Sequence, residues 1–126
     1  MVGVDDSRAW ELISGAQVAV LGTQNPDGTA HLVPFTFVAV SESRALWSAV
    51  DEKPKQSRHL QRLSNIRRDP RVTVLAQHYE PDWSHLWWVR GEGQAALHDQ
   101  PPVGLEQSLI ERYPSYQNQR LEPWVA

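Results

Sequence analysis

Two runs rich in β-branched and apolar residues, 17–23 and 31–40, are separated by Asn25-Pro26-Asp27-Gly28. In such a turn proline presets φ and glycine accepts a positive φ. The spacing predicts an antiparallel hairpin. Pro34 lies inside the second run, and because proline has no N–H to donate to a ladder, we expect an edge strand, a bulge or a strand start there.

The rest of the chain alternates between amphipathic and β-rich segments. Helices are predicted over residues 5–14, 57–68 and 100–113, from apolar spacing and from capping and stop signals. Further strands are predicted over residues 45–50, 72–79 and 86–97, and Gly91 and Gly93 permit a bulge in the last. Five mostly antiparallel strands indicate a mainly β domain with flanking helices (α+β), built as a small barrel or a strongly bent sheet.

The composition excludes several classes of protein. The chain has 126 residues, enough for one domain, and no cysteine, which excludes disulfides, thiolate metal sites and cysteine nucleophiles. No signal peptide is visible, and no apolar run approaches the ~18 residues of a membrane span. We therefore expect a cytoplasmic protein that does not bind membranes.

Basic residues are concentrated in one segment of an otherwise acidic chain. The net charge of −3 argues against nucleic-acid binding. Seven of the twelve basic side chains nevertheless fall within one stretch: Lys53, Lys55, Arg58, Arg62, Arg67, Arg68 and Arg71. Such a patch indicates a specific anionic ligand, and a solvated helix face is an equally good interpretation.

The start of this segment combines a basic loop with a predicted helix N-terminus. Ser57 is the expected N-cap, and the free N–H groups of the first turn lie at the positive end of the helix dipole. Lys53, Lys55 and Arg58 add full charges. The arrangement suits a phosphate or carboxylate group; the alternative is a plain cap with solvated lysines.

Six tryptophans are too many for a core of this size to bury completely, so some are expected at a ligand cleft or a subunit interface. His78 and His85, with Glu80 and Asp82 between them, are interpreted as hydrogen-bonded or surface residues, and no metal site is predicted. No nucleophile motif or glycine-rich phosphate cradle occurs.

Three motifs together resemble a known superfamily. The run from Lys53 to Val72 resembles the phosphate-binding loop and helix of the pyridoxamine 5′-phosphate oxidase-like split β-barrel superfamily. The run from His78 to Gly91 is similar to an actinobacterial branch assigned to coenzyme F420. The segment from His31 to Phe37 is similar to the strand that, in such proteins, packs along the tricyclic ring of the bound cofactor. The resemblance covers roughly residues 10–113.

The resemblance implies a split β-barrel of the FMN-binding type, spanning residues 1–126 as one domain. It implies a homodimer with two cofactor sites at the subunit interface, the cofactor being F420, with FMN as the alternative. Lys53, Lys55, Ser57 and Arg58 would hold the phosphate and acidic tail. The residues that would border the ring or wall the cleft, in part from the partner subunit, are His31, Val33, Pro34, Thr36, Trp87 and Trp88.

The implied function is an F420-dependent oxidoreductase that transfers a hydride between the deazaflavin and a small unsaturated organic substrate. No catalytic side chain is assigned, because hydride transfer belongs to the cofactor. The alternatives are an FMN-dependent pyridoxamine-phosphate-oxidase-like enzyme and a non-catalytic F420- or flavin-binding protein.

The chain departs from the superfamily pattern at its C-terminus. Similar proteins continue past the last helix into another apolar strand, and residues 119–126 leave little room for one. The sequence therefore predicts either a barrel that lacks this strand or a chain that is itself shortened, with consequences for stability and cofactor affinity.

Overall fold

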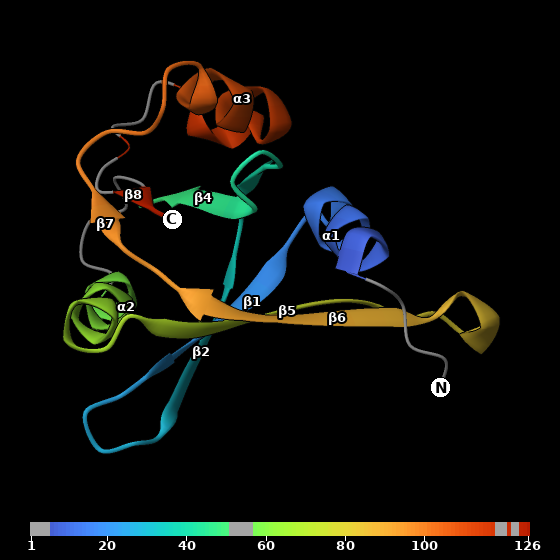
Figure 1. Ribbon diagram of the computed structural model, residues 1–126, viewed down its shortest axis with the longest axis horizontal. Coiled ribbons are helices and arrows are strands. Elements are labelled where there is room, and N and C mark those ends of the chain that lie inside the picture. The colour runs from blue at the N-terminus through green and yellow to red at the C-terminus, as the bar shows by residue number, and fades with distance from the viewer. Residues whose placement is uncertain (1–5, 51–56, 118–120, 122–123) are drawn as a thin grey trace.

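The computed structural model describes residues 6–50, 57–117, 121 and 124–126, with the side chains of residues 57–60 excepted. The elements, shown in Figure 1, are α1 (Asp6–Gly15), β1 (Ala19–Gln24), β2 (Ala30–Phe35), β3 (Val38–Val40), β4 (Ala45–Ala49), α2 (Ser57–Arg68), β5 (Arg71–His78), η1 (Trp83–His85), β6 (Trp87–Gln94), β7 (Leu97–His98), α3 (Leu105–Arg112), η2 (Pro114–Tyr116) and β8 (Trp124–Val125). No helix in these ranges is long and apolar enough to cross a membrane.

Two four-stranded antiparallel sheets share the chain. One has the order β2-β1-β5-β6 and the other β3-β4-β8-β7. Only Thr36 and Phe37 separate β2 from β3, and only Ala95 and Ala96 separate β6 from β7. The strands therefore form a closed circuit that crosses from one sheet to the other at these two junctions. This confirms the predicted α+β class and the split β-barrel.

The hairpin predicted around residues 25–28 is confirmed. β1 and β2 pair antiparallel from Ala19↔Phe35 to Gln24↔Ala30. Gly28 adopts φ +88°, a conformation that favours glycine, and its N–H donates to the Asn25 carbonyl at 2.9 Å. Pro34 lies on β2, which is an edge strand of its sheet. Of the three alternatives predicted for this proline, the edge strand is therefore confirmed.

Two predicted strands are each divided in two. Residues 31–40 are not one strand, because β2 ends at Phe35 and β3 pairs with β4 instead of β1. Residues 86–97 divide at Ala95 and Ala96, where the Ala96 N–H donates to the Ala126 carbonyl at 2.9 Å. The expected bulge at Gly91 and Gly93 does not form, because the β5–β6 register is unbroken across both glycines.

The third helix is shorter than the predicted 100–113. α3 begins at Leu105 because Gly104, its N-cap, adopts φ +85°, a left-handed conformation that interrupts a right-handed helix. Pro101 and Pro102 therefore precede the helix and do not form its first turn.

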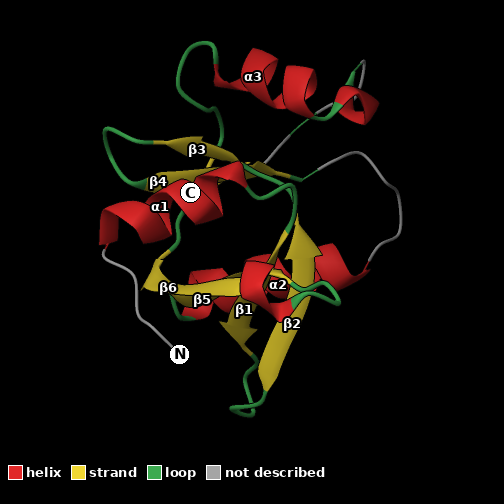
Figure 2. Ribbon diagram, turned by 90° about the vertical axis from the view of Figure 1, so that its right-hand side faces the viewer, coloured by secondary structure: helices red, strands yellow, loops and turns green. Residues whose placement is uncertain are grey.

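Three apolar clusters hold the layers together. One packs α1 against the sheet β2-β1-β5-β6 and contains Ile13, Leu21 and Phe37. A second packs β4 and β8 against α3, and a third contains Leu63 and Ile66 of α2. Figure 2 shows α3 covering β3 and β4, with α1 beside the space between the two sheets.

The chain ends in a strand of two residues. β8 pairs with β4 through Ala49↔Trp124 and with β7 through His98↔Trp124. A strand thus follows the last helix where the sequence predicted that it could be lacking, and because β8 lies between two neighbours it closes the circuit of the barrel.

Candidate functional site

The predicted anion-binding segment begins at the entrance to α2. Lys53 and Lys55 lie outside the described residues, and Ser57 and Arg58 are described only by their backbone, as the first residues of α2. The N–H groups of that first turn have no partners within the helix. The helix dipole adds partial positive charge at the same place. The backbone therefore supplies the helix N-terminus that the prediction required.

A buried amide fixes α2 against the end of β1. Asn65 is fully buried, and its Nδ2 donates to Thr23 Oγ1 and to Asn25 Oδ1, both at 3.0 Å. Its Oδ1 accepts from Gln61 Nε2 at 2.8 Å, and Arg68 donates to the Gln24 carbonyl. These bonds set the position of α2 and therefore of its N-terminus.

Asn65→Ala is expected to lower the free energy of unfolding by about 2–4 kcal/mol, because it leaves buried Thr23 without a donor and opens a cavity. Chemical denaturation measures the change. Ser64→Ala, on the exposed side of the same helix, is the matched control and should change stability by less than about 0.5 kcal/mol. Similar losses in both variants would contradict the role given to Asn65.

The four residues predicted to border the ring do not share one face. Successive side chains of a strand alternate, so His31 and Val33 face the barrel interior, while Pro34 faces outward and is exposed. Thr36 follows β2, and its Oγ1 lies 2.6 Å from the hydroxyl of Tyr116. The structure thus separates this set into an inner pair, an outer proline and a threonine engaged with η2.

A second tyrosine holds the same crossover. The hydroxyl of Tyr113 donates to the Gln17 carbonyl at 2.8 Å and accepts from the Phe37 N–H at 3.4 Å. The crossover from β2 to β3 is therefore fixed by two tyrosines from the segment after residue 112. Sequence reasoning missed both tyrosines, and local patterning offered no signal for them.

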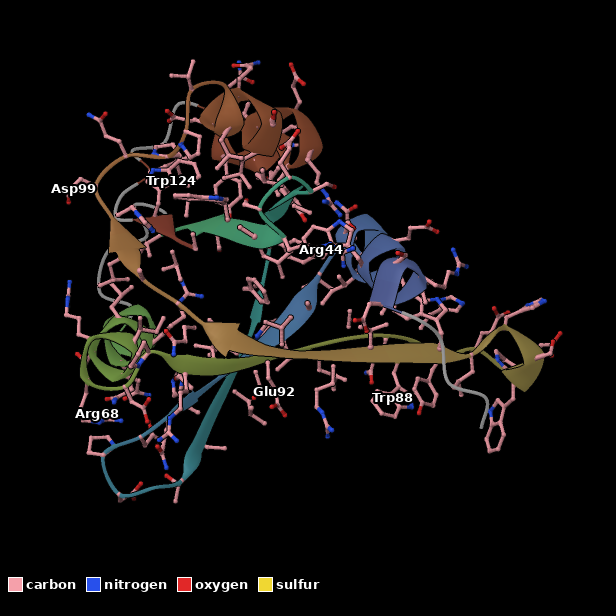
Figure 3. The ribbon with its side chains drawn as sticks, in the orientation of Figure 1. Arg44, Arg68, Trp88, Glu92, Asp99 and Trp124 are labelled. Atoms are coloured by element: carbon pink, nitrogen blue, oxygen red, sulfur yellow. The ribbon has the colours of Figure 1, made fainter. Side chains whose placement is uncertain are left out.

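The two tryptophans of β6 lie on opposite faces of the sheet. Trp87 is half-buried, packs against the first apolar cluster, and stacks on His78 with ring centroids 6.4 Å apart. Trp88 is 39% exposed, and Figure 3 shows it pointing away from α1 and β4. Only Trp88 therefore shares a face with Pro34.

Trp88 and Pro34 are nevertheless well separated within one chain. They lie on β6 and β2, the two edges of the sheet β2-β1-β5-β6. Three strand spacings of about 4.8 Å put these edges about 14 Å apart. One chain therefore does not bring both residues against the same ring.

The face that carries Trp88 and Pro34 is solvent-exposed and combines apolar residues with polar ones such as Arg90 and Glu92, and we call it the outer face. Its apolar residues are Val20, Leu32, Pro34, Leu75 and Trp88, of which Leu32 is 66% exposed. The strand register aligns Pro34, Val20, Leu75 and Arg90 in one row across the sheet. A contiguous exposed apolar surface of this kind is typical of an interaction site.

Comparison with known proteins identifies the family. The family profile described as pyridoxamine 5′-phosphate oxidase matches residues 6–123. The chain belongs to the pyridoxamine 5′-phosphate oxidase family. No curated protein matches its sequence.

Several solved structures have a similar fold. A conserved hypothetical protein from Mycobacterium tuberculosis superposes with a TM-score of 0.73 at 21% identity, covering 98% of this chain and 79% of that one. An FAD-binding protein from Mycobacterium smegmatis gives 0.58 at 18%, covering 97% and 87%. The heme storage protein from Vibrio cholerae gives 0.61 at 14%, covering 94% and 89%. At these identities the likeness shows the fold alone.

One unsatisfied polar group lies on the inner side of β2, near the contacts that dock α2. The Nδ1 of His31 is buried and has no hydrogen-bond partner among the described residues. His31 pairs with Thr23 in the β1–β2 register, and Thr23 bonds to Asn65 of α2. An orphaned polar atom next to the α2 docking contacts fits a ligand that brings its own polar groups.

Part of the basic segment serves the fold. Arg62 is only 6% exposed. Arg71 forms a bidentate pair with Asp69, at 3.0 Å from Nε to Oδ1 and 2.7 Å from Nη2 to Oδ2. Hydrogen bonds from Arg71 lower the pKa of Asp69 to about 2. The seven basic residues are therefore neither one solvated face nor one anion-binding patch.

The histidines near the tip of the β5–β6 hairpin are hydrogen-bonded, as predicted. Glu80 Oε1 lies 2.8 Å from His78 Nε2 and 3.2 Å from His85 Nδ1. The pKa of Glu80 is lowered by hydrogen bonds from these two rings, and the bond from His78 has the larger effect. Among the described residues, no group of three or more His, Asp or Glu side chains could hold a metal ion.

Asn65 is the functional residue that the sequence could have revealed. It lies among Arg62, Leu63 and Ile66, all buried on the same side of α2. A short amide on the apolar side of an amphipathic helix is a buried polar group, and such groups require partners.

Proposed function

We propose that this protein is an oxidoreductase that binds coenzyme F420 and transfers a hydride between the deazaflavin and a small unsaturated organic substrate. The observation that carries the proposal is the basic loop leading into the N-terminus of α2, in a chain of the pyridoxamine 5′-phosphate oxidase family. When bound, the deazaflavin supplies the redox chemistry. The chain supplies binding, orientation and exclusion of water.

The proposed roles follow from charge and position. Lys53, Lys55, Ser57 and Arg58 hold the phosphate and the acidic tail, together with the first N–H groups of α2. Asn65 lies near the other end of α2 and fixes the helix as a whole against β1, which also sets the position of its N-terminus. These residues contribute affinity and take no part in the chemical step.

The ring site requires two subunits in this proposal. Pro34 and Trp88 lie at opposite edges of the outer face. Two protomers could stack with their outer faces together, related by a two-fold axis that runs between them along the strands. One protomer's β6 edge would then lie against its partner's β2 edge. The site would then contain Pro34 of one subunit and the partner subunit's Trp88. The apolar residues of the outer face support this arrangement because protein interfaces are enriched in aromatic residues at their core.

The protein is therefore expected to be a homodimer. Light scattering should give twice the 14.3 kDa chain mass. Leu32→Glu should shift the protein toward monomer, because each interface would then bury two unpaired carboxylates. Val103→Glu is the control, since Val103 is fully exposed before α3. A native chain that remains folded and monomeric at micromolar concentration would overturn the interfacial site.

The cofactor is assigned by its anionic groups. FMN ends in one phosphate, whereas in F420 the phosphate is a diester that carries a carboxylate-rich glutamyl tail. Each additional anionic group near the loop gains Coulomb energy that FMN does not. Because an aromatic wall accepts either ring, the tail must supply the discrimination.

Direct titration with F420, FMN and F420 with a shortened tail tests the assignment. We expect affinity to fall in the order F420, shortened F420, FMN. The similarity to an FAD-binding protein favours FMN as the second candidate. Tighter FMN binding, or no effect of the tail, would replace the first assignment with the second. Binding without turnover of any unsaturated acceptor would favour a non-catalytic carrier.

A further inference from the structure

A cavity of about 720 Å³ lies between the two sheets of the barrel. Its walls come from α1, α2, β1, β2, β4, β5, β6 and β8, and they include Leu21, Phe35, Leu46, Val74 and Val89. This volume is within the range of small-molecule sites, which are also mostly apolar. None of the described residues proposed to border the cofactor ring lines it.

Two glycines create much of this space. Val72 pairs with Gly93 and Val74 with Gly91, so both glycines face the cavity beside apolar partners. A Cβ atom added at either glycine would meet nothing within 4 Å, and neither glycine has a positive φ. Two of the inward positions of β6 at the cavity therefore lack side chains although the backbone would accept them, while the third, Val89, keeps an apolar one.

Two of the polar residues that line the cavity are buried. Arg62 of α2 and Ser48 of β4 both line it and are both buried, at 6% and 7% exposure. Ser48 pairs with Val125, which packs in the same apolar cluster as Leu63 of α2. A buried guanidinium and a buried hydroxyl thus both line the cavity on the side of α2.

The opposite end opens to solvent. The exposed lining residues Asp6, Ser43 and Arg44 mark the opening at the start of α1 and the β3–β4 turn. Figure 3 shows Arg44 beside α1. Trp10 of α1 lines the cavity near this opening and is fixed by hydrogen bonding to Ser41 at 3.1 Å.

We propose that this cavity binds a small amphipathic carboxylic acid, with its apolar body along the glycine-lined wall and its carboxylate toward Arg62 and Ser48. Guanidinium groups bind planar carboxylates through paired charge-assisted hydrogen bonds. The apolar walls supply affinity in proportion to chain length. The site is independent of the proposed cofactor and of the hydride chemistry.

Calorimetric titration with straight-chain carboxylates, from butanoate to octanoate, tests the proposal on the full chain without cofactor. Affinity should rise roughly three- to fourfold for each methylene group, which corresponds to about 0.8 kcal/mol per buried CH₂. Octanol should bind at least about tenfold more weakly than octanoate, because it lacks the charge-assisted bonds. Equal affinity for the alcohol would overturn the assignment of a carboxylate.

Gly91→Val with Gly93→Val is the decisive variant. Valine favours strands and the cavity has room for it, so the fold should be kept while octanoate affinity falls at least about tenfold. Thr73→Val is the matched control, because it introduces valine on the neighbouring strand at a residue that does not line the cavity; it should bind octanoate normally. F420 titration should be unchanged in the valine variant, which separates this cavity from the proposed function. Unaltered octanoate binding in that variant would eliminate the cavity as the site.

Discussion

Trp124→Ala is expected to lower the free energy of unfolding by about 3–5 kcal/mol, as large-to-small changes at buried aromatic residues do. Trp124 is 1% exposed and is the largest fully buried side chain among the described residues. It packs against Leu105, Leu109 and Leu121 in the second cluster. Because small domains are only about 5–15 kcal/mol stable, the variant should lose a large fraction of its stability.

Urea denaturation with Trp83→Ala as control measures this effect. Trp83 undergoes the same substitution but is 77% exposed, so its removal should cost less than about 0.5 kcal/mol. Deleting residues 124–126 should destabilise at least as much as Trp124→Ala, because β4 and β7 would also lose their shared partner. A deletion without effect on stability would show that β8 does not close the barrel.

The second large effect is expected on cofactor binding. Lys53→Ala combined with Lys55→Ala should weaken F420 binding at least about a hundredfold, since each hydrogen bond to a charged group contributes roughly 1.5–3 kcal/mol. The loss should be smaller at high ionic strength if the contacts are exposed. FMN, with one phosphate, should lose less than F420.

The controls for this experiment come from the same segment. Arg67→Ala removes an exposed positive charge near the C-terminal end of α2 and should leave F420 affinity within about twofold, because screening weakens exposed charges at a distance. The unfolding midpoints of all variants should agree. If both single variants and the double variant bind F420 normally, the loop is a plain helix cap and the proposed anion site is wrong.

Local chemistry explains what the sequence predicted correctly. The turn at residues 25–28 depends on the φ preferences of Pro26 and Gly28, which act within four residues. α2 follows from apolar spacing. It ends before Asp69-Pro70 because a proline disfavours the helical conformation of the residue that precedes it, which is again a local effect. The barrel class and the family followed from the order of such segments together with the resemblance.

The candidate site was predictable only in part. The basic residues and the helix start at Ser57 are local features, and the helix start is confirmed. The separation of Trp87 from Trp88, and of Val33 from Pro34, follows from strand alternation once the register is known. The distance between Pro34 and Trp88 could not be predicted, because it depends on strand order.

The sequence by itself determined the turns, the helix positions and the basic loop, because these depend on backbone preferences and charges of near neighbours. The tertiary structure decided where the strands change partners. β2 passes into β3 where Tyr113 and Tyr116 hold the crossover from about 80 residues away. It also decided that Arg62 is buried and that Gly91 and Gly93 face a cavity. Such outcomes depend on which distant segments meet, and no local pattern encodes that choice.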